Sequence, residues 1–331
     1  MNGVRTTSLA HALLLAVLKR RRPPAPPPAG DAAERRVRYS LAGVPPPHSV
    51  LFTTSQGLFL YSAEDREVTR LLDGKYYGVA KLGDRWLLTH SDNRGPKWKR
   101  YTDICAVRIE DRRVASFEIA VQALPREIHQ IDTIDGRLVM PHTGFNQILW
   151  IHGDRIAAGA RSRTLLSCAS IPLRIARPSH LNSVFRAEPG APIHLVAHNS
   201  TAHTGRWSDI LLFREDSGEL EVRPTSAHSA HNVYADTDGV LYCDSNHGKL
   251  MRDDRVLFAS DKLLRGLSVT DAHLLVGGSD IDFEGRSRMT SDATLYLLDR
   301  AGRLLGTMVM PGIGVLYEIR QAVVRDYARS S

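Results

Sequence analysis

The chain has 331 residues, of which 43% are hydrophobic and 24% are charged. This composition is ordinary for a globular protein that buries a large core, and the length allows one large all-β domain or two domains of usual size. The net charge is +7, but residues 1–38, with eight basic and two acidic residues, account for +6 of it. The rest of the chain is close to neutral, which argues against a nucleic-acid partner.

Residues 1–38 form an N-terminal extension that is basic and rich in proline. Its apolar run, SLAHALLLAVL, is shorter than the roughly 20 apolar residues that cross a membrane. The basic cluster at 19–22 follows this run, whereas a secretory signal carries its positive charge ahead of it. Two interpretations stay open: a loosely docked extension with a proline-rich linker, or a short amphipathic helix through which residues 9–22 make weak contact with an anionic membrane surface.

Three cysteines, Cys105, Cys168 and Cys243, lie far apart in the sequence. This spacing does not match a CxxC metal or redox pair. We therefore expect reduced thiols and a cytoplasmic protein, with peripheral membrane association as the alternative if the N-terminal helix forms.

From residue 48 to residue 325 the chain repeats one pattern. Six apolar strands that end in small polar residues begin near residues 50, 86, 138, 194, 241 and 274. Most are followed by a second apolar strand and several by a third, and five are preceded by a shorter strand that ends in a tight turn. Four strands per repeat are typical of a propeller blade. The sequence therefore predicts an all-β fold, a six-bladed β-propeller with four-stranded blades.

The first copy of the repeat has no leading strand, and the C-terminal end of the chain supplies one. The segment GVLYEIR at 314–320 has the character of a leading strand and follows the last blade. We expect it to pair with the blade that begins at residue 50, because this pairing closes the ring and removes exposed strand edges.

Polar residues are predicted to gather on one face of this propeller. In each blade the start of the innermost strand lies on the same face as the loop between the second and third strands, and here both carry the polar residues. The residues expected near the axis on this face are Tyr77, His129, Gln130, His180, Asn182, His231, Asn232, Arg265, Tyr317 and Glu318. His198 and Asn199 belong to the loop at 197–207, which is predicted on the same face.

Three consecutive blades place an imidazole in this group, at His129, His180 and His231. Three histidines with an open position are a common site for one divalent metal ion. In the fourth blade, however, aligning LNSV with HNV puts Asn182 rather than His180 at the equivalent place. Two other interpretations stay open. One is a polar network that only satisfies backbone groups at strand ends. The other is a metal-free ligand site formed by Tyr77, Gln130, Asn182, His198, Asn199, Asn232 and Tyr317.

The segments HLNSV, HNVYADTDGVLYCDS and RGLSVTDAHLLVGGS resemble a bacterial group of six-bladed propellers, broadly similar to the NHL and gluconolactonase (regucalcin)-like propellers. The resemblance covers residues 48–325 and implies the fold. Gluconolactonase-like enzymes hold a divalent cation with Glu, Asn and Asp ligands on this face, and the residues nearest to that set are Glu318, Asn182 and Asn232. Propeller lyases with histidine-bound metals are the second comparison.

Three functions follow from these alternatives. The first is a binding module for a polar small molecule, such as a saccharide, or for the loop of a protein partner. The second is a metal-dependent hydrolase or lyase in which Arg265 neutralises an anionic substrate group and Glu318 acts as the general base. The third is a protein-interaction scaffold. We expect a monomer in each case.

Overall fold

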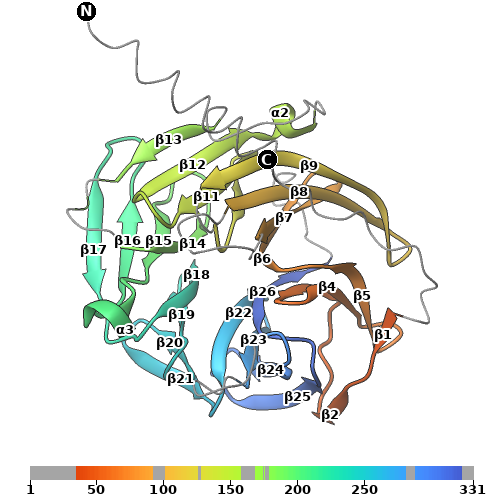
Figure 1. Cartoon of the computed structure of the whole chain (residues 1–331). Coiled ribbons are helices and arrows are strands. Elements are labelled where there is room, and N and C mark those ends of the chain that lie inside the picture. Colours follow the sequence, from red (N-terminus) through yellow and green to blue (C-terminus); the bar gives the residue numbers. More distant parts are fainter. Residues whose placement is uncertain are drawn as a thin grey trace, which may run out of the picture.

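The structure is a computed structural model that describes residues 35–91, 101–125, 128–157, 168–173, 175, 179–280 and 288–322. Nearly all regular structure in these residues is β-strand, arranged in six antiparallel sheets. The sheets stand around a common centre as the blades of a ring (Figure 1). The prediction of a six-bladed β-propeller is confirmed.

Each blade contains four antiparallel strands, which are named below in order from the centre of the ring outward. Blade 1 contains β26 (Leu316–Gln321), β3 (Val50–Thr54), β4 (Gly57–Ser62) and β5 (Glu67–Asp73). Blade 2 contains β6 (Tyr76–Leu82), β7 (Arg85–Ser91), β8 (Tyr101–Glu110) and β9 (Arg113–Pro125). Blade 3 contains β10 (Asp132–Ile134), β11 (Arg137–His142), β12 (Gln147–His152) and β13 (Ala169–Pro172), with the short helix α2 (Gly153–Ala157) after β12.

The second half of the ring repeats this order. Blade 4 contains β14 (Leu181–Phe185), β15 (Ile193–Ala197), β16 (Asp209–Phe213) and β17 (Leu220–Pro224), with the helix α3 (Thr201–Thr204) between β15 and β16. Blade 5 contains β18 (Ala230–Asp236), β19 (Gly239–Asp244), β20 (Lys249–Arg252) and β21 (Arg255–Ala259). Blade 6 contains β22 (Leu263–Val269), β23 (His273–Ser279), β24 (Ala293–Asp299) and β25 (Leu304–Met310).

Among the described residues, six apolar clusters lie one between each pair of neighbouring blades, and a small seventh cluster contains Tyr77, Val315 and Tyr317. Between blades 1 and 6, for example, Phe52 and Phe59 pack with Leu295 and Met308. Strands such as β3 and β4 are buried at every position because each face of the blade is covered by a neighbour. This explains why the repeats are runs of apolar residues rather than alternating ones.

The ring is closed by the C-terminal strand. β26 pairs with β3 in antiparallel register, with Ile319 opposite Phe52. This is the closure that the segment at 314–320 predicts. The strand adds the innermost position to blade 1, which otherwise has only strands from the beginning of the propeller.

A second connection joins blades 1 and 6, on the outside of the ring. β1 (Arg36–Val37) pairs with β5 of blade 1, and β2 (Ser40–Gly43) pairs with β25 of blade 6. We call residues 36–43 the strap. The sequence prediction does not assign these residues to a blade, because each strand is very short and lies within or next to the basic extension.

The strap is held by more than its backbone pairs. Arg36 forms an ion pair with Glu67 at 2.9 Å, and Val44 N–H donates to the Leu305 carbonyl at 3.0 Å. A side chain at Gly306 would meet the Val44 carbonyl oxygen at 1.9 Å, so only glycine lets the strap approach blade 6 this closely.

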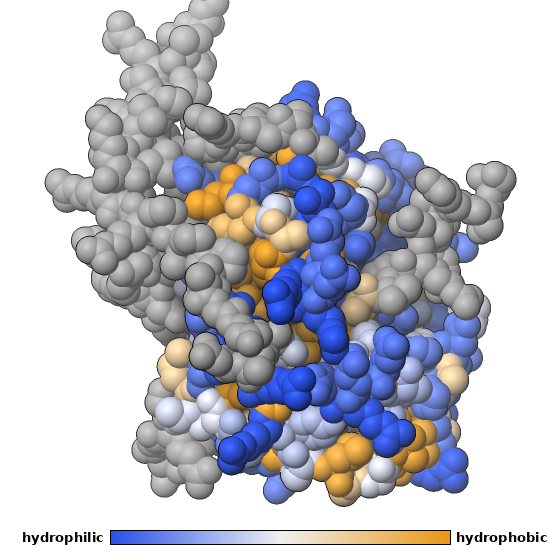
Figure 2. Space-filling model, turned by 90° about the vertical axis from the view of Figure 1, so that its right-hand side faces the viewer, coloured by the Kyte–Doolittle hydropathy of each residue, from blue (hydrophilic) through white to orange (hydrophobic). Residues whose placement is uncertain are grey.

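The predicted membrane-contact segment, residues 9–22, lies outside the described residues. Among the residues that the structure describes, no helix is long and apolar enough to cross a membrane. The side of the ring in Figure 2 has a mixed surface, with polar residues among apolar ones. Cys105 and Cys243 are buried, and Cys168 is partly buried.

Candidate functional site

The starts of the six inner strands bring together residues from every blade. Tyr77 lies on β6, His231 on β18, Arg265 on β22 and Tyr317 on β26. His129 and His180 lie just ahead of β10 and β14. The predicted meeting of side chains from separate blades at one point is therefore observed for these six residues.

Four imidazoles form the centre of this group. The ring centroids of His129 and His180 are 5.3 Å apart, those of His180 and His198 4.7 Å, those of His198 and His231 5.0 Å, and those of His231 and His129 6.1 Å. We call these four residues the histidine cluster. His198 follows β15, and the sequence predicts it as a ligand-binding residue rather than with the other histidines.

Two tyrosines and an arginine border the histidine cluster. Tyr77 stacks on His129 with the ring centroids 4.7 Å apart, and the ring centroids of Tyr77 and Tyr317 are 4.5 Å apart. The Arg265 Cζ lies 4.8 Å from the centroid of Tyr317, and its Nη2 donates to His129 Nδ1 at 3.2 Å. Lys75 Nζ lies 4.5 Å from the centroid of Tyr77. The border therefore carries positive charge.

Three histidines of the cluster are neutral at pH 7. Burial lowers the pKa values of His129, His198 and His231 well below the usual histidine range. Neighbouring imidazoles and Arg265 lower these pKa values further, because a positive charge on one ring opposes another.

Hydrogen bonds fix which nitrogen of these three neutral imidazoles carries the hydrogen. His129 Nδ1 accepts from Arg265, and His198 Nδ1 accepts from Ser200 N–H at 3.0 Å. Both rings therefore carry their hydrogen on Nε2. His231 Nδ1 donates to the Ser229 carbonyl at 2.8 Å, so its Nε2 is an acceptor. The cluster combines hydrogen-bond donors with an acceptor.

Backbone irregularities direct these side chains toward the axis. In β18, His231 pairs with Cys243 and Val233 with Tyr242, so Asn232 is an inserted residue, with a φ of 55°. A similar register shift occurs near the start of β6, β14, β22 and β26. Such bulges re-aim side chains and commonly lie near functional sites.

The bulges also settle the alignment of blade 4. In β14 the inserted residue is Asn182, which is thus equivalent to Asn232. Leu181 takes the place of His231, and His180 lies one residue earlier, in the left-handed region with a φ of 51°. His180 reaches the cluster from a different backbone position than His231 does.

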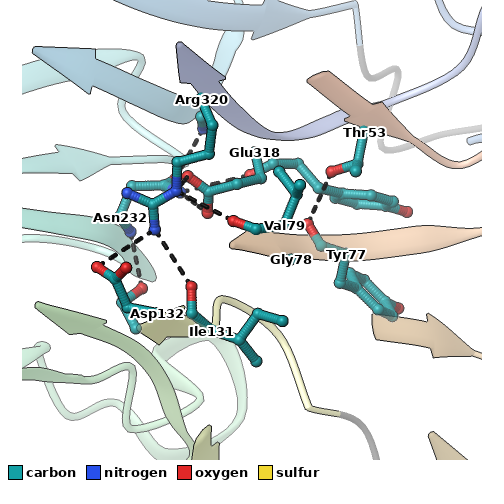
Figure 3. Close-up of polar contacts among 12 residues, drawn as sticks. Thr53, Tyr77, Gly78, Val79, Ile131, Asp132, Asn232, Glu318 and Arg320 are labelled. Atoms are coloured by element: carbon teal, nitrogen blue, oxygen red, sulfur yellow. Dashed lines mark hydrogen bonds and ion pairs between the residues drawn. The ribbon is translucent and has the colours of Figure 1, made fainter. Parts of the chain in front are cut away.

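Several predicted site residues instead form a buried layer next to the cluster, shown in part in Figure 3. Asn232 Nδ2 donates to Glu318 Oε2 at 3.0 Å, and Asn232 Oδ1 accepts from Gly266 N–H at 2.7 Å. Asn182 Nδ2 donates to the Ala230 carbonyl at 2.9 Å. These side chains connect inner strands of different blades.

Arg320 extends this layer to blades 2 and 3. Its Nε donates to the Val79 carbonyl at 3.1 Å and its Nη2 to the Ile131 carbonyl at 3.2 Å (Figure 3). It lies 3.6 Å from carboxylate oxygens of both Glu318 and Asp132. We call the whole layer the axial belt, which consists of Asp132, Asn182, Ser183, Asn232, Glu318 and Arg320.

Two further predicted residues are buried. Gln130 N–H donates to the Asn182 carbonyl at 3.0 Å, and its side-chain oxygen has no hydrogen-bond partner among the described residues. Asn199 Nδ2 donates to the Trp207 carbonyl at 2.6 Å and to Asp209 Oδ2 at 2.7 Å. Asn199 thus fixes the loop that presents His198.

The residues present do not suit the cation that the gluconolactonase resemblance implies. The amide oxygen of Asn232 accepts from Gly266 N–H, and that of Asn182 accepts from Ser183 Oγ at 2.9 Å. Glu318 is bound to Asn232 and faces Arg320. Both amide oxygens thus already accept a hydrogen bond, and the carboxylate of Glu318 lies beside a guanidinium, which makes this set a poor fit for a cation.

The three-histidine metal site stays a prediction that the hydrogen bonds do not favour. His129 has Arg265 on Nδ1 and a hydrogen on Nε2, whereas a metal ligand needs a free lone pair. Among the described residues, no group of three or more His, Cys, Asp or Glu side chains is arranged to hold a metal ion.

Comparisons with known proteins identify the fold and not the activity. No family model matches the chain, and a search of curated proteins finds no relative. Solved structures do match, and those described below share low sequence identity with this chain. Their similarity is at a level that shows the fold alone.

One match is a structure of a nidogen/laminin complex, with a TM-score of 0.59 and 11% identity, covering 83% of this chain and 98% of that one. A gluconolactonase from Xanthomonas campestris has a TM-score of 0.56 and 14% identity, covering 90% and 91%. A putative glucose dehydrogenase from Thermus thermophilus has a TM-score of 0.52 and 13% identity, covering 83% and 97%. The predicted similarity to gluconolactonase-like propellers is confirmed.

Sequence reasoning missed Arg320, Asp132 and Lys75. Arg320 had a detectable signal, because it is a second charged residue next to Glu318 in an otherwise apolar closing strand. Asp132 had none, since an aspartate near a tight turn is common in any hairpin.

Proposed function

We propose that the protein binds a polar small molecule at the histidine cluster. The observation that carries this proposal is the meeting of four imidazoles with Arg265 at the starts of the inner strands. Three of these imidazoles are neutral and carry both donors and an acceptor, as recognition of a hydroxylated molecule requires. A saccharide is one such molecule, and two of the similar propellers are named for sugar-related activities.

The proposal is supported by the axial belt, because the belt connects the blades and the histidine cluster is not needed for this. The side chains of the belt bind to one another and to backbone groups of neighbouring blades, and these bonds connect the inner strands without the histidine cluster. A group of polar side chains that adds nothing to closure is more readily explained by a ligand than by stability alone.

The test is a ligand-observed NMR screen of saccharides, polyols, sugar acids and small amides against the whole chain. We expect at least one compound to bind. His198→Phe keeps a planar ring but removes the donor, and we expect it to abolish that binding.

His152→Ala is the matched control, because His152 is an exposed histidine outside the cluster, at the end of β12. It should bind the compound as the unmodified protein does. Binding that His198→Phe leaves unchanged, or no binding by any compound, would contradict the proposal.

A further inference from the structure

Arg265 differs from the other strongly buried arginines of the described chain in having no carboxylate partner. Its exposed fraction is only 7%, and among the described residues no carboxylate lies within 4.0 Å of its guanidinium. Arg186, by comparison, is paired with Asp135 and Glu215. Arg320 lies 3.6 Å from both Asp132 and Glu318.

The contacts that Arg265 makes do not neutralise its charge. It donates to a neutral imidazole at His129 and lies over the ring of Tyr317. Its Nε is buried without a hydrogen-bond partner among the described residues. A buried charge that is neither paired nor fully hydrogen-bonded is costly.

Glu318, an acid that acts electrostatically on Arg265, is a poor counter-ion for it. Glu318 is engaged by Asn232 and Arg320 in the axial belt. Burial also raises the pKa of Glu318 to about 7, so part of the population carries no charge at neutral pH. Lys75, above the ring of Tyr77, adds a second positive charge to the same border.

The proposed function supplies the missing partner, and this inference rests on it. We propose that the ligand of the histidine cluster is a hydroxylated oxyanion whose negative group pairs with Arg265. The hydrogens on Nε2 of His129 and His198 are further donors in the same cluster as the guanidinium, as an oxyanion requires. The acceptor at His231 Nε2 receives a hydroxyl of the same ligand.

The experiment uses three small probes that share a polyol skeleton: glycerate, glycerol 3-phosphate and glycerol. Thermal unfolding of the whole chain is measured with each probe in a buffer of low chloride. We expect at least one anion to raise the Tm by about 2–4 °C near ten times its Kd, and glycerol to have no effect. The two anions distinguish a carboxylate ligand from a phosphate ligand.

Arg265→Met removes the charge and keeps the length of the side chain. We expect it to abolish the effect of the anions. In their absence the Tm should not fall, because removing a buried unpaired charge offsets the loss of the hydrogen bond to His129. The matched control is Arg186→Met, which removes one of the two arginines that pair with Asp135 and Glu215. It should lower the Tm and keep the response to the anions.

If Arg265→Met does not fold, Arg265→Lys keeps a positive charge but loses the planar fork, and it should weaken the response about tenfold. The inference is overturned if neither anion changes the Tm of the unmodified protein, or if the Arg265 variants respond as it does. The inference is also overturned if glycerol binds as well as the two anions do. The proposed function would then stand, because a polar small molecule would still bind.

Discussion

Glu318 is predicted from the sequence as a general base, and the structure places it in the axial belt. Its side chain is fully buried, bound to Asn232 and 3.6 Å from Arg320. Burial raises its pKa to about 7, with Arg320 opposing the shift and Asp132 adding to it. A catalytic role for Glu318 stays a prediction, but its position already makes it a determinant of stability.

The contribution of Glu318 to the stability of the protein should fall as the pH rises from about 4.5 to about 7, whereas the three histidines with lowered pKa values contribute in the opposite direction. The unfolded chain ionises Glu318 near the ordinary glutamate pKa of 4.5, whereas the folded chain keeps it protonated up to a pKa of about 7. Folding therefore binds a proton in this window, and this contribution is lost with rising pH. The difference corresponds to about 3 kcal/mol.

Glu318→Gln removes the titrating group and can keep the hydrogen bond from Asn232. Denaturant unfolding of both proteins from pH 5 to pH 8 measures the effect. We expect the variant to gain stability relative to the unmodified protein as the pH rises. A difference that does not change with pH would show that Glu318 does not titrate in this window.

Metal binding can be tested at the level of single residues. After incubation with zinc or manganese and removal of free ions, elemental analysis should find well below one ion per chain, because Arg265 occupies Nδ1 of His129. Near-stoichiometric metal that is lost in a His129→Ala/His231→Ala double variant with an unchanged circular dichroism spectrum would instead establish the three-histidine site.

The sequence predicted which residues gather at the centre, but not which ones touch each other. Tyr77, His129, His231, Arg265 and Tyr317 all lie where strand starts place them. The separation of the histidine cluster from the axial belt depends on contacts between blades. These contacts cannot be predicted from local sequence patterns. For that reason the sequence alone does not separate Asn182, Asn232 and Glu318 from the residues of the cluster.

At the level of the strand, the bulges decide the direction of each side chain. One inserted residue moves the following side chains to the other face of a strand. Asn232 has no sequence signal that separates a bulge from an ordinary strand residue, whereas Gly266, as a glycine inside a strand, does have one. The strands could therefore be predicted, while the direction of their side chains at the axis could not.

Gly266→Ala tests the bulge in β22. Gly266 has a φ of +86°, and a Cβ there would meet Leu316 Cδ2 of the closing strand at 2.5 Å. We expect the free energy of unfolding to fall by about 2–4 kcal/mol, from the strained backbone and the contact together. Chemical denaturation measures this.

The control for this variant is Gly83→Ala. Gly83 also has a positive φ, of +58°, but a Cβ there would meet nothing within 4 Å. Only the backbone cost, about 1 kcal/mol, should remain. Equal effects of the two variants would mean that contact with β26 is unimportant.

At the scale of the whole molecule, most of the architecture could be read from the sequence. Six copies of a strand pattern predicted six blades, and one unassigned strand at the C-terminal end predicted the closure. The strap could not be predicted, because pairs as short as Arg36–Val37 have no periodicity to detect.

The strap should contribute measurably to stability. A chain that begins at Arg35 keeps the strap, and a chain that begins at Pro45 lacks it. We expect the shorter chain to have a Tm lower by about 5 °C, since it loses the pairs with β5 and β25. Equal Tm values would show that these pairs add nothing.

The strap and the closing strand act on the same seam from opposite sides. β26 holds it at the axis and the strap holds it at the rim. Separating blades 1 and 6 requires both ladders to break at once, so this interface has no partial opening of low energy. We expect the amide hydrogens of β3 and β25 to exchange with solvent as slowly as those deep in the ring, through global unfolding alone.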